Sequence, residues 1–367
     1  MDKKLKIAII GSRGYPYVYS GYETLVKELS ERLSQKGHSV RVYCHRSLFK
    51  KKPKYVNGIE LIYTPSIQNK FLSQITNSFF SFIHVCFSDT DIILVLNTAN
   101  GPFGILTKIF RKKTCINVDG LEWLRPKWKG LGSIYFKISS ILSTCFFDKI
   151  ITDSIEMSKV YQKKFNKQSS IIAYGSTINK INNTDFLSKL EIYKNEYYLI
   201  VGRLIPDNNA QFIIKSFLKH NTNKKLVIVG DVPYNDKYVN KIKSICSDKI
   251  VMTGYVNCQN KLSQLYINCF GYIHGHEFGG TNPTMINALY LNCEVIALKT
   301  PFNLEMLKNK KSVFFSKNTS ELNEALFYFE KNIEKLKLEN INYKIPKKYD
   351  WDQIAEQYLE VFYNSIS

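Results

Sequence analysis

Short apolar runs alternate with amphipathic segments along the whole chain. In the first half, the segment from about Ser20 to Gln35 places Leu25, Leu29 and Leu33 on one stripe, which predicts a helix that covers a sheet. The strands expected around it are Lys6–Ile10, Ser39–Cys44, Ile59–Tyr63, Ile92–Leu96, Thr114–Val118, Lys149–Thr152 and Ser170–Ala173. Strands that alternate with helices favour a parallel sheet.

The same pattern returns in the second half, after a polar stretch rich in Asn and Lys. This stretch, Ser176 to Asn195, is predicted to be a linker. Further strands are expected at Tyr197–Val201, Lys225–Val229, Ile250–Thr253, Gly271–Ile273 and Glu294–Leu298, and a helix at Trp351–Tyr363. Two such units in series predict an α/β fold with two Rossmann-like, doubly wound domains, residues 1–185 and 186–345, facing each other across a cleft.

The chain is strongly basic. Its 367 residues include 51 Lys and Arg against 31 Asp and Glu, a formal net charge of +20. Such an excess favours anionic partners: nucleic acid, an acidic lipid surface or phosphorylated substrates. The lysines are dispersed and no recognised nucleic-acid module is present, which argues against a nucleic-acid-binding protein.

Cysteine usage and apolar stretches indicate the compartment. None of the eight cysteines forms a CxxC pair, so we expect reduced core thiols in a cytoplasmic protein, not disulfides or a zinc site. The start MDKKLKIAII lacks a small-residue cleavage site, so a signal peptide is not expected. The most apolar stretch, Phe71 to Phe87, is too polar and too short to span a bilayer.

Glycines follow the first predicted strand. The run Gly11-Ser12-Arg13-Gly14 comes directly after it, and Gly21 opens the next helix, where ligands of open parallel sheets bind. The alternative is an ordinary turn between strand and helix. The segment is not a GxGxxG fingerprint, and no acidic residue ends the second strand, which argues against a dinucleotide-dependent dehydrogenase.

Two segments of the second domain contain the strongest candidates for ligand-binding residues. Arg203 follows the strand Tyr197–Val201, where a guanidinium can bind a diphosphate with two parallel hydrogen bonds; the alternative is a surface salt bridge. After the strand Gly271–Ile273 come Glu277, which can accept hydrogen bonds from sugar hydroxyls, and a glycine turn before a helix that starts near Thr284. Backbone N–H groups of this turn can bind phosphate, and its candidate residues are Gly279, Gly280, Thr281 and Asn282. His274 and His276 are expected to be structural, because no further metal ligand stands at a suitable spacing.

Two carboxylates follow the strand Thr114–Val118. Asp119 and Glu122 are expected on the acceptor side of the cleft. A carboxylate pair also suggests a glycoside hydrolase, in which one acts as acid and the other as nucleophile. The doubly wound, phosphate-binding setting argues against that alternative.

These residues carry a resemblance that spans nearly the whole chain. The segments IGSRGYPYVYSGYET, NVDGLEW, VGRLIPDNN, IVGDVPY and HGHEFGGTNP, in this order, resemble glycosyltransferase family 4. More narrowly, they are similar to the bacterial rhamnosyltransferase branch that builds capsule, O-antigen and cell-wall polysaccharide. The resemblance implies a GT-B fold whose last helix, within residues 346–367, crosses back to the first domain. It also implies retention of anomeric configuration, no metal or other cofactor, and a dTDP-rhamnose-like donor.

The resemblance also implies roles for single residues. Glu277 matches the first glutamate of the family's pair, which contacts the transferred sugar, and Arg203 matches the diphosphate-binding arginine. Asn208 stands where the wider family has a lysine, and Arg13 is expected to supply the missing charge. Asn287 stands where the second glutamate would hold ribose hydroxyls, and it can still hydrogen-bond a hydroxyl. Asp119 falls where many members have a histidine.

The sequence therefore predicts a retaining glycosyltransferase that uses a nucleotide-sugar donor and a lipid-linked or growing saccharide acceptor. The alternatives are a nucleotide-sugar epimerase of the same fold and a basic nucleic-acid-binding protein. A basic, aromatic face is expected against anionic lipid on the inner side of the plasma membrane; the alternative is that its aromatic residues are core. That face comprises Phe71, Phe79, Phe80, Phe82, Phe87, Lys70, Lys108, Arg111, Lys112 and Lys113.

Overall fold

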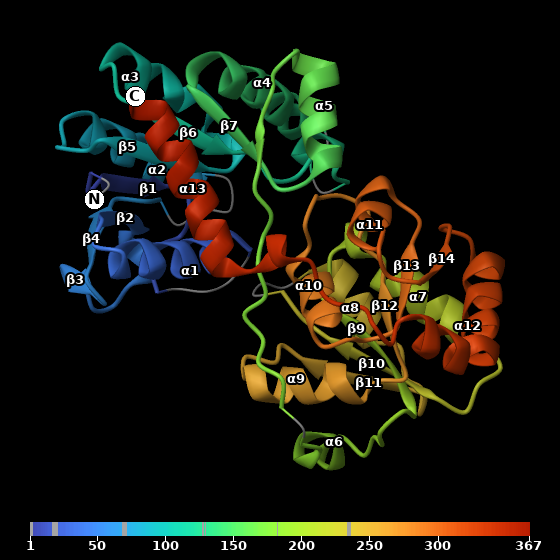
Figure 1. The fold of residues 1–367 in the computed structure, drawn as a ribbon. Helices are drawn as coiled ribbons and strands as arrows, with labels where there is room; N and C mark the ends of the chain where they lie inside the picture. Colours follow the sequence, from blue (N-terminus) through green and yellow to red (C-terminus); the bar gives the residue numbers. More distant parts are fainter. Residues whose placement is uncertain are drawn as a thin grey trace. The chain divides into compact units, whose positions relative to one another are not determined.

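The chain forms two compact units. The computed structural model describes residues 3–16, 21–67, 72–126, 128, 130–181, 183–232 and 236–367. Unit 1 comprises Met1–Gly175 together with Lys347–Ser367, and unit 2 comprises Ser176–Pro346 (Figure 1). Each unit has its own sheet with helices on its faces, so the prediction of two doubly wound α/β domains is confirmed.

Unit 1 contains an eight-stranded sheet in the order β3-β4-β2-β1-β5-β6-β7-β8. All neighbours in it are parallel except β3 and β4. Its strands are β1 (Lys6–Ile10), β2 (Ser39–His45), β3 (Tyr55–Val56), β4 (Ile59–Thr64), β5 (Ile92–Leu96), β6 (Thr114–Asn117), β7 (Lys149–Thr152) and β8 (Ser170–Ile171). Its helices are α1 (Gly21–Gln35), α2 (Leu72–Cys86), α3 (Gly104–Ile109), α4 (Leu131–Phe146), α5 (Ile155–Phe165) and α13 (Trp351–Ile366).

The core of unit 1 follows from its apolar pattern. Every residue of β5 is buried, as expected for a parallel strand covered on both faces. Leu25, Leu29 and Leu33 of α1 are buried on the stripe that the sequence predicts.

Unit 2 contains a parallel sheet of six strands in the order β11-β10-β9-β12-β13-β14. The strands are β9 (Tyr197–Val201), β10 (Lys225–Val229), β11 (Ile250–Gly254), β12 (Gly271–His274), β13 (Val295–Leu298) and β14 (Val313–Phe315). The helices are α6 (Asp185–Lys189), α7 (Ala210–Phe217), α8 (Lys237–Lys243), α9 (Gln259–Asn268), α10 (Pro283–Tyr290), α11 (Pro301–Met306) and α12 (Thr319–Glu339). One apolar cluster joins β9, β10 and β12–β14 to α7 and α12.

The segment predicted to be a linker belongs to unit 2, so its assignment is corrected. The backbone N–H of Ile181 donates to Ser263 Oγ (3.3 Å), and that of Phe186 donates to Gln264 Oε1 (2.9 Å), which fastens the segment to α9. Leu187 and Ile192 are buried despite the polar composition around them. The boundary between the units therefore lies after Gly175, earlier than the predicted position after residue 185.

The C-terminal helix α13 packs on unit 1. Arg32 of α1 pairs with Asp352 at 2.7 Å, and Asn117 Nδ2 donates to Tyr358 Oη at 2.9 Å. Trp351 lies against Gly175, where an added Cβ would come within 2.8 Å of the indole. The last residues of the chain thus complete the first sheet's helical cover (Figure 1).

The cysteine prediction holds in part. All eight cysteines are free thiols. Five are buried, whereas Cys145, Cys246 and Cys258 are exposed, which corrects the expectation that they are core residues. They lie on the outer side of α4, beyond the end of α8 and directly before α9.

Candidate active site

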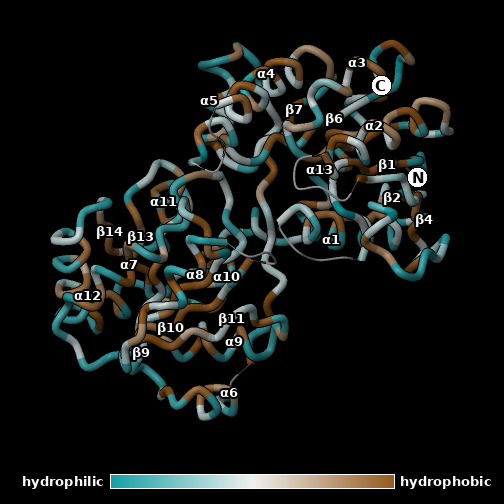
Figure 2. Tube along the Cα trace, turned by 180° about the vertical axis from the view of Figure 1, so that it is seen from behind, coloured by the Kyte–Doolittle hydropathy of each residue, from teal (hydrophilic) through white to brown (hydrophobic). Residues whose placement is uncertain are grey.

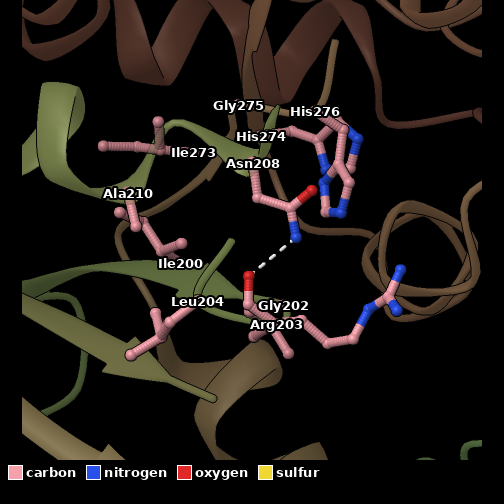
Figure 3. Close-up of a pocket in the computed structure, with 11 residues that line it drawn as sticks. Ile200, Gly202, Arg203, Leu204, Asn208, Ala210, Ile273, His274, Gly275 and His276 are labelled. Carbon is pink, nitrogen blue, oxygen red and sulfur yellow. Dashed lines mark hydrogen bonds between the residues drawn. The ribbon is translucent and has the colours of Figure 1, made fainter. Parts of the chain in front are cut away.

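The candidate site of unit 2 lies where two neighbouring strands end. β9 pairs with β10 on one side and with β12 on the other, so the strand order reverses between β9 and β12. Ligands of open parallel sheets bind at such a switch point, beyond the carboxyl ends of the strands. A small cavity of about 10 Å³ lies there (Figure 3), lined by Ile200, Val201, Gly202, Arg203, Leu204, Asn208, Ala210, Ile273, His274, Gly275 and His276.

Hydrogen bonds fasten the loops after β9 and β12 to each other. Asn209 Nδ2 donates to the carbonyl of Gly275 at 2.8 Å, and the backbone N–H of Glu277 donates to the carbonyl of Asp207 at 3.0 Å. The backbones also approach closely, since a Cβ on Gly275 would lie 2.6 Å from the Asn208 carbonyl oxygen. These contacts fix the positions of Arg203 and Glu277 along one sheet edge.

Arg203 presents a cation at this edge. It is exposed, and no side chain or carbonyl of the described residues pairs with its guanidinium. Nothing within the described chain therefore competes with an anion for it, as binding of a diphosphate requires.

Asn208, counted among the candidate substrate-binding residues because it stands where the wider family has a lysine, supports the Arg203 backbone. It is buried, and its Nδ2 donates to the Arg203 carbonyl at 2.8 Å (dashed in Figure 3). This hydrogen bond uses one N–H of the amide, and the contact of Asn208 with a substrate stays a prediction.

Glu277 pairs with a residue that the sequence analysis missed. Lys317 Nζ donates to Glu277 Oε1 at 2.5 Å, and the side chains are 51% and 18% exposed. Lys317 follows β14, which is two strands away from β12 in the sheet. Nothing in the sequence distinguishes Lys317 from the other lysines. Only the order of the strands in the sheet places it beside Glu277.

The glycine turn and the helix start predicted after β12 are present. Gly279 has a φ of +119°, and Asn282 caps α10 by accepting a hydrogen bond from the Thr284 N–H at 3.0 Å. The side chain of Asn282 is therefore a helix cap. Within the described part of the chain, the N–H groups of Gly279 and Gly280 donate to no protein acceptor, so they are available to a ligand. Thr281 is buried beside them.

Asn287 is engaged inside unit 2. It lies buried on α10, and Ser176 Oγ donates to its Oδ1 at 2.9 Å. Its predicted contact with ribose hydroxyls stays a prediction, and it would have to involve the amide nitrogen or displace Ser176.

The two histidines of the site are stacked, with ring centroids 4.6 Å apart. His274 is buried and its Nδ1 lies 2.9 Å from Tyr272 Oη. Burial lowers the pKa of His274 to about 3, so it is neutral at physiological pH. No group of three His, Cys, Asp or Glu side chains within the described ranges could hold a metal ion.

In unit 1, Arg13 is held by a buried carboxylate. Its backbone N–H donates to Glu23 Oε1 at 3.0 Å, and its guanidinium lies 3.8 Å from the same oxygen. The expectation that Arg13 supplies the missing positive charge stays a prediction, and its side chain is 42% exposed beside this carboxylate. Gly14 packs on Cys44, where an added Cβ would lie 2.7 Å from the sulfur, and Gly21 begins α1.

Asp119 and Glu122 lie in a network of aromatic and charged side chains after β6. Tyr174 Oη donates to Asp119 Oδ2, and Tyr22 Oη to the Asp119 carbonyl, both at 3.2 Å. Burial raises the pKa of Asp119, and the nearby Arg125 opposes that shift.

Glu122 is buried and is bound on two sides. It pairs with Arg125 at 3.1 Å and accepts a hydrogen bond from Trp128 Nε1 at 2.6 Å. Since Tyr22 is in the first turn of α1, the structure brings Gly21 and Asp119 to the same edge of the first sheet. Their contact with an acceptor stays a prediction.

Two protein families match adjoining parts of the chain. Residues 182–347 match the family described as "Glycosyl transferases group 1", and residues 4–177 match "Domain of unknown function (DUF1972)". The first match covers nearly all of unit 2, which carries Arg203 and Glu277.

Three known proteins illustrate the similarity. A probable sucrose-phosphate synthase of Thermosipho melanesiensis is 22% identical over 94% of this chain and 90% of its own length. The N-acetylgalactosamine-N,N'-diacetylbacillosaminyl-diphospho-undecaprenol 4-alpha-N-acetylgalactosaminyltransferase of Campylobacter jejuni is 27% identical over 28% of each chain. The structure of Anabaena Alr3699/HepE in complex with UDP has a TM-score of 0.74 at 14% identity, covering 98% of this chain and 100% of that chain. The predicted GT-B fold is thereby confirmed.

Proposed function

We propose that this chain, a glycosyltransferase with the GT-B fold, moves a sugar from a nucleoside diphosphate to a lipid-linked or growing saccharide acceptor. The observation that carries the proposal is Arg203, an exposed guanidinium at the switch point between β9 and β12, in a loop that is hydrogen-bonded to the loop leading from β12 toward α10. The UDP complex of a protein with the same fold supports a nucleotide donor. The name of the Campylobacter relative supports a lipid-linked acceptor.

The site residues divide the chemistry between them. Arg203 and the N–H groups of Gly279 and Gly280 offset the negative charge that develops on the leaving diphosphate, and electrostatic stabilisation of this kind often contributes most of an enzyme's rate enhancement. Glu277 accepts hydrogen bonds from hydroxyls of the transferred sugar and thereby orients it. These groups supply the charge compensation without a metal ion, so we propose a metal-independent reaction.

The bond changes follow from retention of configuration. The bond between the anomeric carbon and the diphosphate oxygen breaks, and the acceptor hydroxyl forms the new glycosidic bond on the same face of the sugar. The proton of that hydroxyl passes to the leaving phosphate oxygen. Asp119 and Glu122 position the acceptor in this scheme.

We propose dTDP-rhamnose as the donor, on the strength of the motif resemblance. A thermal-shift panel of dTDP-, UDP- and GDP-linked sugars tests it, because a ligand that binds only the folded state raises Tm. The dTDP-linked sugar is expected to give the largest shift. A larger shift with a UDP-linked sugar would replace the donor assignment, and conversion of the donor without acceptor would favour an epimerase. No shift with any of them would contradict the proposed function.

Lys317 is expected to act on the donor through Glu277. Lys317→Met removes the partner of the Glu277 carboxylate, and charge-assisted hydrogen bonds are strong enough that we expect a fall in kcat/KM of roughly tenfold. Lys317→Arg should recover most of the activity. Lys335→Met, an exposed lysine of α12, is the control and should leave the rate unchanged. Equal kinetics of Lys317→Met and wild type would show that the ion pair has no part in donor use.

A further inference from the structure

Helix α4 of unit 1 exposes an apolar stripe. Leu131, Ile134, Ile138 and Ile141 are between 42% and 85% exposed, and their spacing places them on one face of the helix. A soluble helix normally turns such a stripe toward the core. Here the buried face of α4 consists largely of small polar residues, Ser139, Ser140, Ser143 and Thr144.

The exposed apolar surface continues over two neighbouring helices. α3 packs against both α2 and α4. The ring of Phe87, directly after α2, lies 4.9 Å from that of Phe110, directly after α3, and Lys108 of α3 donates to the Cys145 carbonyl of α4 at 2.9 Å. Figure 2 shows hydrophobic segments along these helices. We name this surface the α2–α4 face; its exposed apolar residues are Phe79, Phe80, Ile83, Phe87, Ile105, Ile109, Phe110, Leu131, Ile134, Ile138 and Ile141.

The face differs from the one that the sequence predicts. Phe79, Phe80 and Phe87 are exposed as expected, but Phe82 is buried between the rings of Phe103 and Phe147 and does not belong to it. Phe71 and Lys70 lie outside the described residues. The prediction lacked the whole apolar stripe of α4, and it also lacked Ile83, Ile105, Ile109 and Phe110.

The charged residues of the three helices and of the turn after α3 are all cations, and Asp89, two residues after Phe87, is paired with Lys6. Lys108, Arg111, Lys113 and Lys137 are exposed, and Lys112 is half-buried. The sequences of α2, α3 and α4 contain no Asp or Glu. A second copy bound symmetrically through this face would bring cation against cation, whereas anionic headgroups complement it. The charge thus selects an anionic surface as the occupant.

We propose that the α2–α4 face docks unit 1 on the surface of an anionic bilayer. Its isoleucine and phenylalanine side chains enter the interface, while the lysines and the arginine contact the headgroups. No helix in the described ranges is long and apolar enough to cross a membrane, so the contact is with the surface. The docking is inferred from the exposed side chains and their charge. It rests on the proposed function only for the reason to dock, which is that the enzyme must reach an acceptor held in the bilayer.

Vesicle sedimentation of the full chain tests the docking. We expect binding to vesicles that contain phosphatidylglycerol, little binding to phosphatidylcholine alone, and release by high salt, because screening weakens exposed charges. Ile134→Asp with Ile138→Asp should weaken binding at least about tenfold, since it places two charges in the apolar contact. Lys108→Gln with Arg111→Gln and Lys113→Gln should weaken it roughly 100-fold.

A matched control comes from unit 2. Leu338→Asp with Ile341→Asp changes two apolar side chains of similar exposure and should leave vesicle binding unaltered. Vesicle binding that is unchanged by Ile134→Asp with Ile138→Asp, or that is equal with and without phosphatidylglycerol, would contradict the docking. So would a loss of self-association in sedimentation velocity without a loss of vesicle binding, which would assign the face to a second copy.

Two further measurements separate the possible failures. The thermal midpoint of each variant shows whether it folds, since the changed residues are exposed and should lower it little. Vesicle binding needs neither donor nor acceptor. Retained vesicle binding in a protein that no nucleotide sugar stabilises would support the docking while contradicting the proposed function.

Discussion

In the Arg203→Ala variant, we expect kcat/KM for sugar transfer to fall by about 100- to 1,000-fold. Removal of one preorganised donor that stabilises transition-state charge has an effect of this size in enzymes. Arg203 has no partner among the described side chains, and its backbone is fixed by Asn208 (2.8 Å), so the fold should tolerate the change. The loss would therefore report on the reaction itself.

Ligand-induced shifts in Tm test whether Arg203 binds the diphosphate, without any measurement of activity. Wild-type Tm should rise more with a nucleoside diphosphate than with the nucleoside, because the guanidinium binds the diphosphate. Arg203→Ala should lose that difference, and Arg203→Lys should keep part of it, since an ammonium cannot make the two parallel hydrogen bonds. Arg46→Ala, an exposed arginine in unit 1, is the control. A difference that persists in Arg203→Ala would assign the diphosphate to another residue.

The strands of both sheets could be predicted well because parallel strands are buried on both faces. β1, β5, β7, β9 and β10 begin and end where the apolar runs do. Two short edge strands were missed, β3 with two residues and β14 with three, whereas β8, also of two residues, lies within the predicted Ser170–Ala173. Runs of two or three residues carry no periodicity of their own, so such strands are found only where a longer apolar run continues beyond them.

The buried faces of α2 and α4 could not be predicted from the sequence, because polar side chains lie on them. On the inner face of α2, Asn77 Nδ2 donates to Thr64 Oγ1 at 2.7 Å and Ser81 Oγ lies 2.9 Å from the same atom. Polar side chains on a buried face reverse the usual pattern of an amphipathic helix. The outward apolar stripe of α4 has the same origin, and only the packed structure tells which face is covered.

In the candidate site, too, some residues could be predicted from the sequence and others could not. Arg203, Glu277 and the turn at Gly279 and Gly280 follow their strands directly, so the sequence could place them at one sheet edge. The partners of these residues could not be predicted. Lys317 reaches Glu277 only through the order β12-β13-β14, and the use of Asn208 depends on the path of the loop after β9.

The Lys310→Met variant is expected to lose about 3–5 kcal/mol of its free energy of unfolding, because it leaves a buried carboxylate without its cation. Lys310 Nζ lies 3.8 Å from Glu294 Oε2, with side chains only 1% and 10% exposed. Asn340 Nδ2 donates to the same carboxylate oxygen at 2.6 Å. Urea unfolding of the variant and the wild type measures the difference.

The dependence on pH identifies the buried charge as the cause. Burial raises the pKa of Glu294 and lowers that of Lys310, so each charged form is disfavoured in the folded state relative to the unfolded chain. Without Lys310, the pKa of Glu294 should rise further. A carboxyl with a raised folded pKa destabilises the fold above that pKa, and the cost disappears as the pH falls toward the unfolded value. The deficit of Lys310→Met should therefore shrink on acidification.

A double variant completes the argument. Glu294→Gln combined with Lys310→Met removes both charges and keeps an acceptor for Asn340, so we expect it to recover most of the lost stability at neutral pH. Lys310 Nζ also lies 4.7 Å from the centroid of the Tyr343 ring, a contact that both variants lack. A double variant as unstable as Lys310→Met, with a deficit that does not change with pH, would trace the loss to that ring contact and to packing. Recovery in the double variant would instead show that the instability of Lys310→Met comes from the unpaired Glu294 carboxylate. The Glu294–Lys310 pair would then protect the fold only while both charges are present.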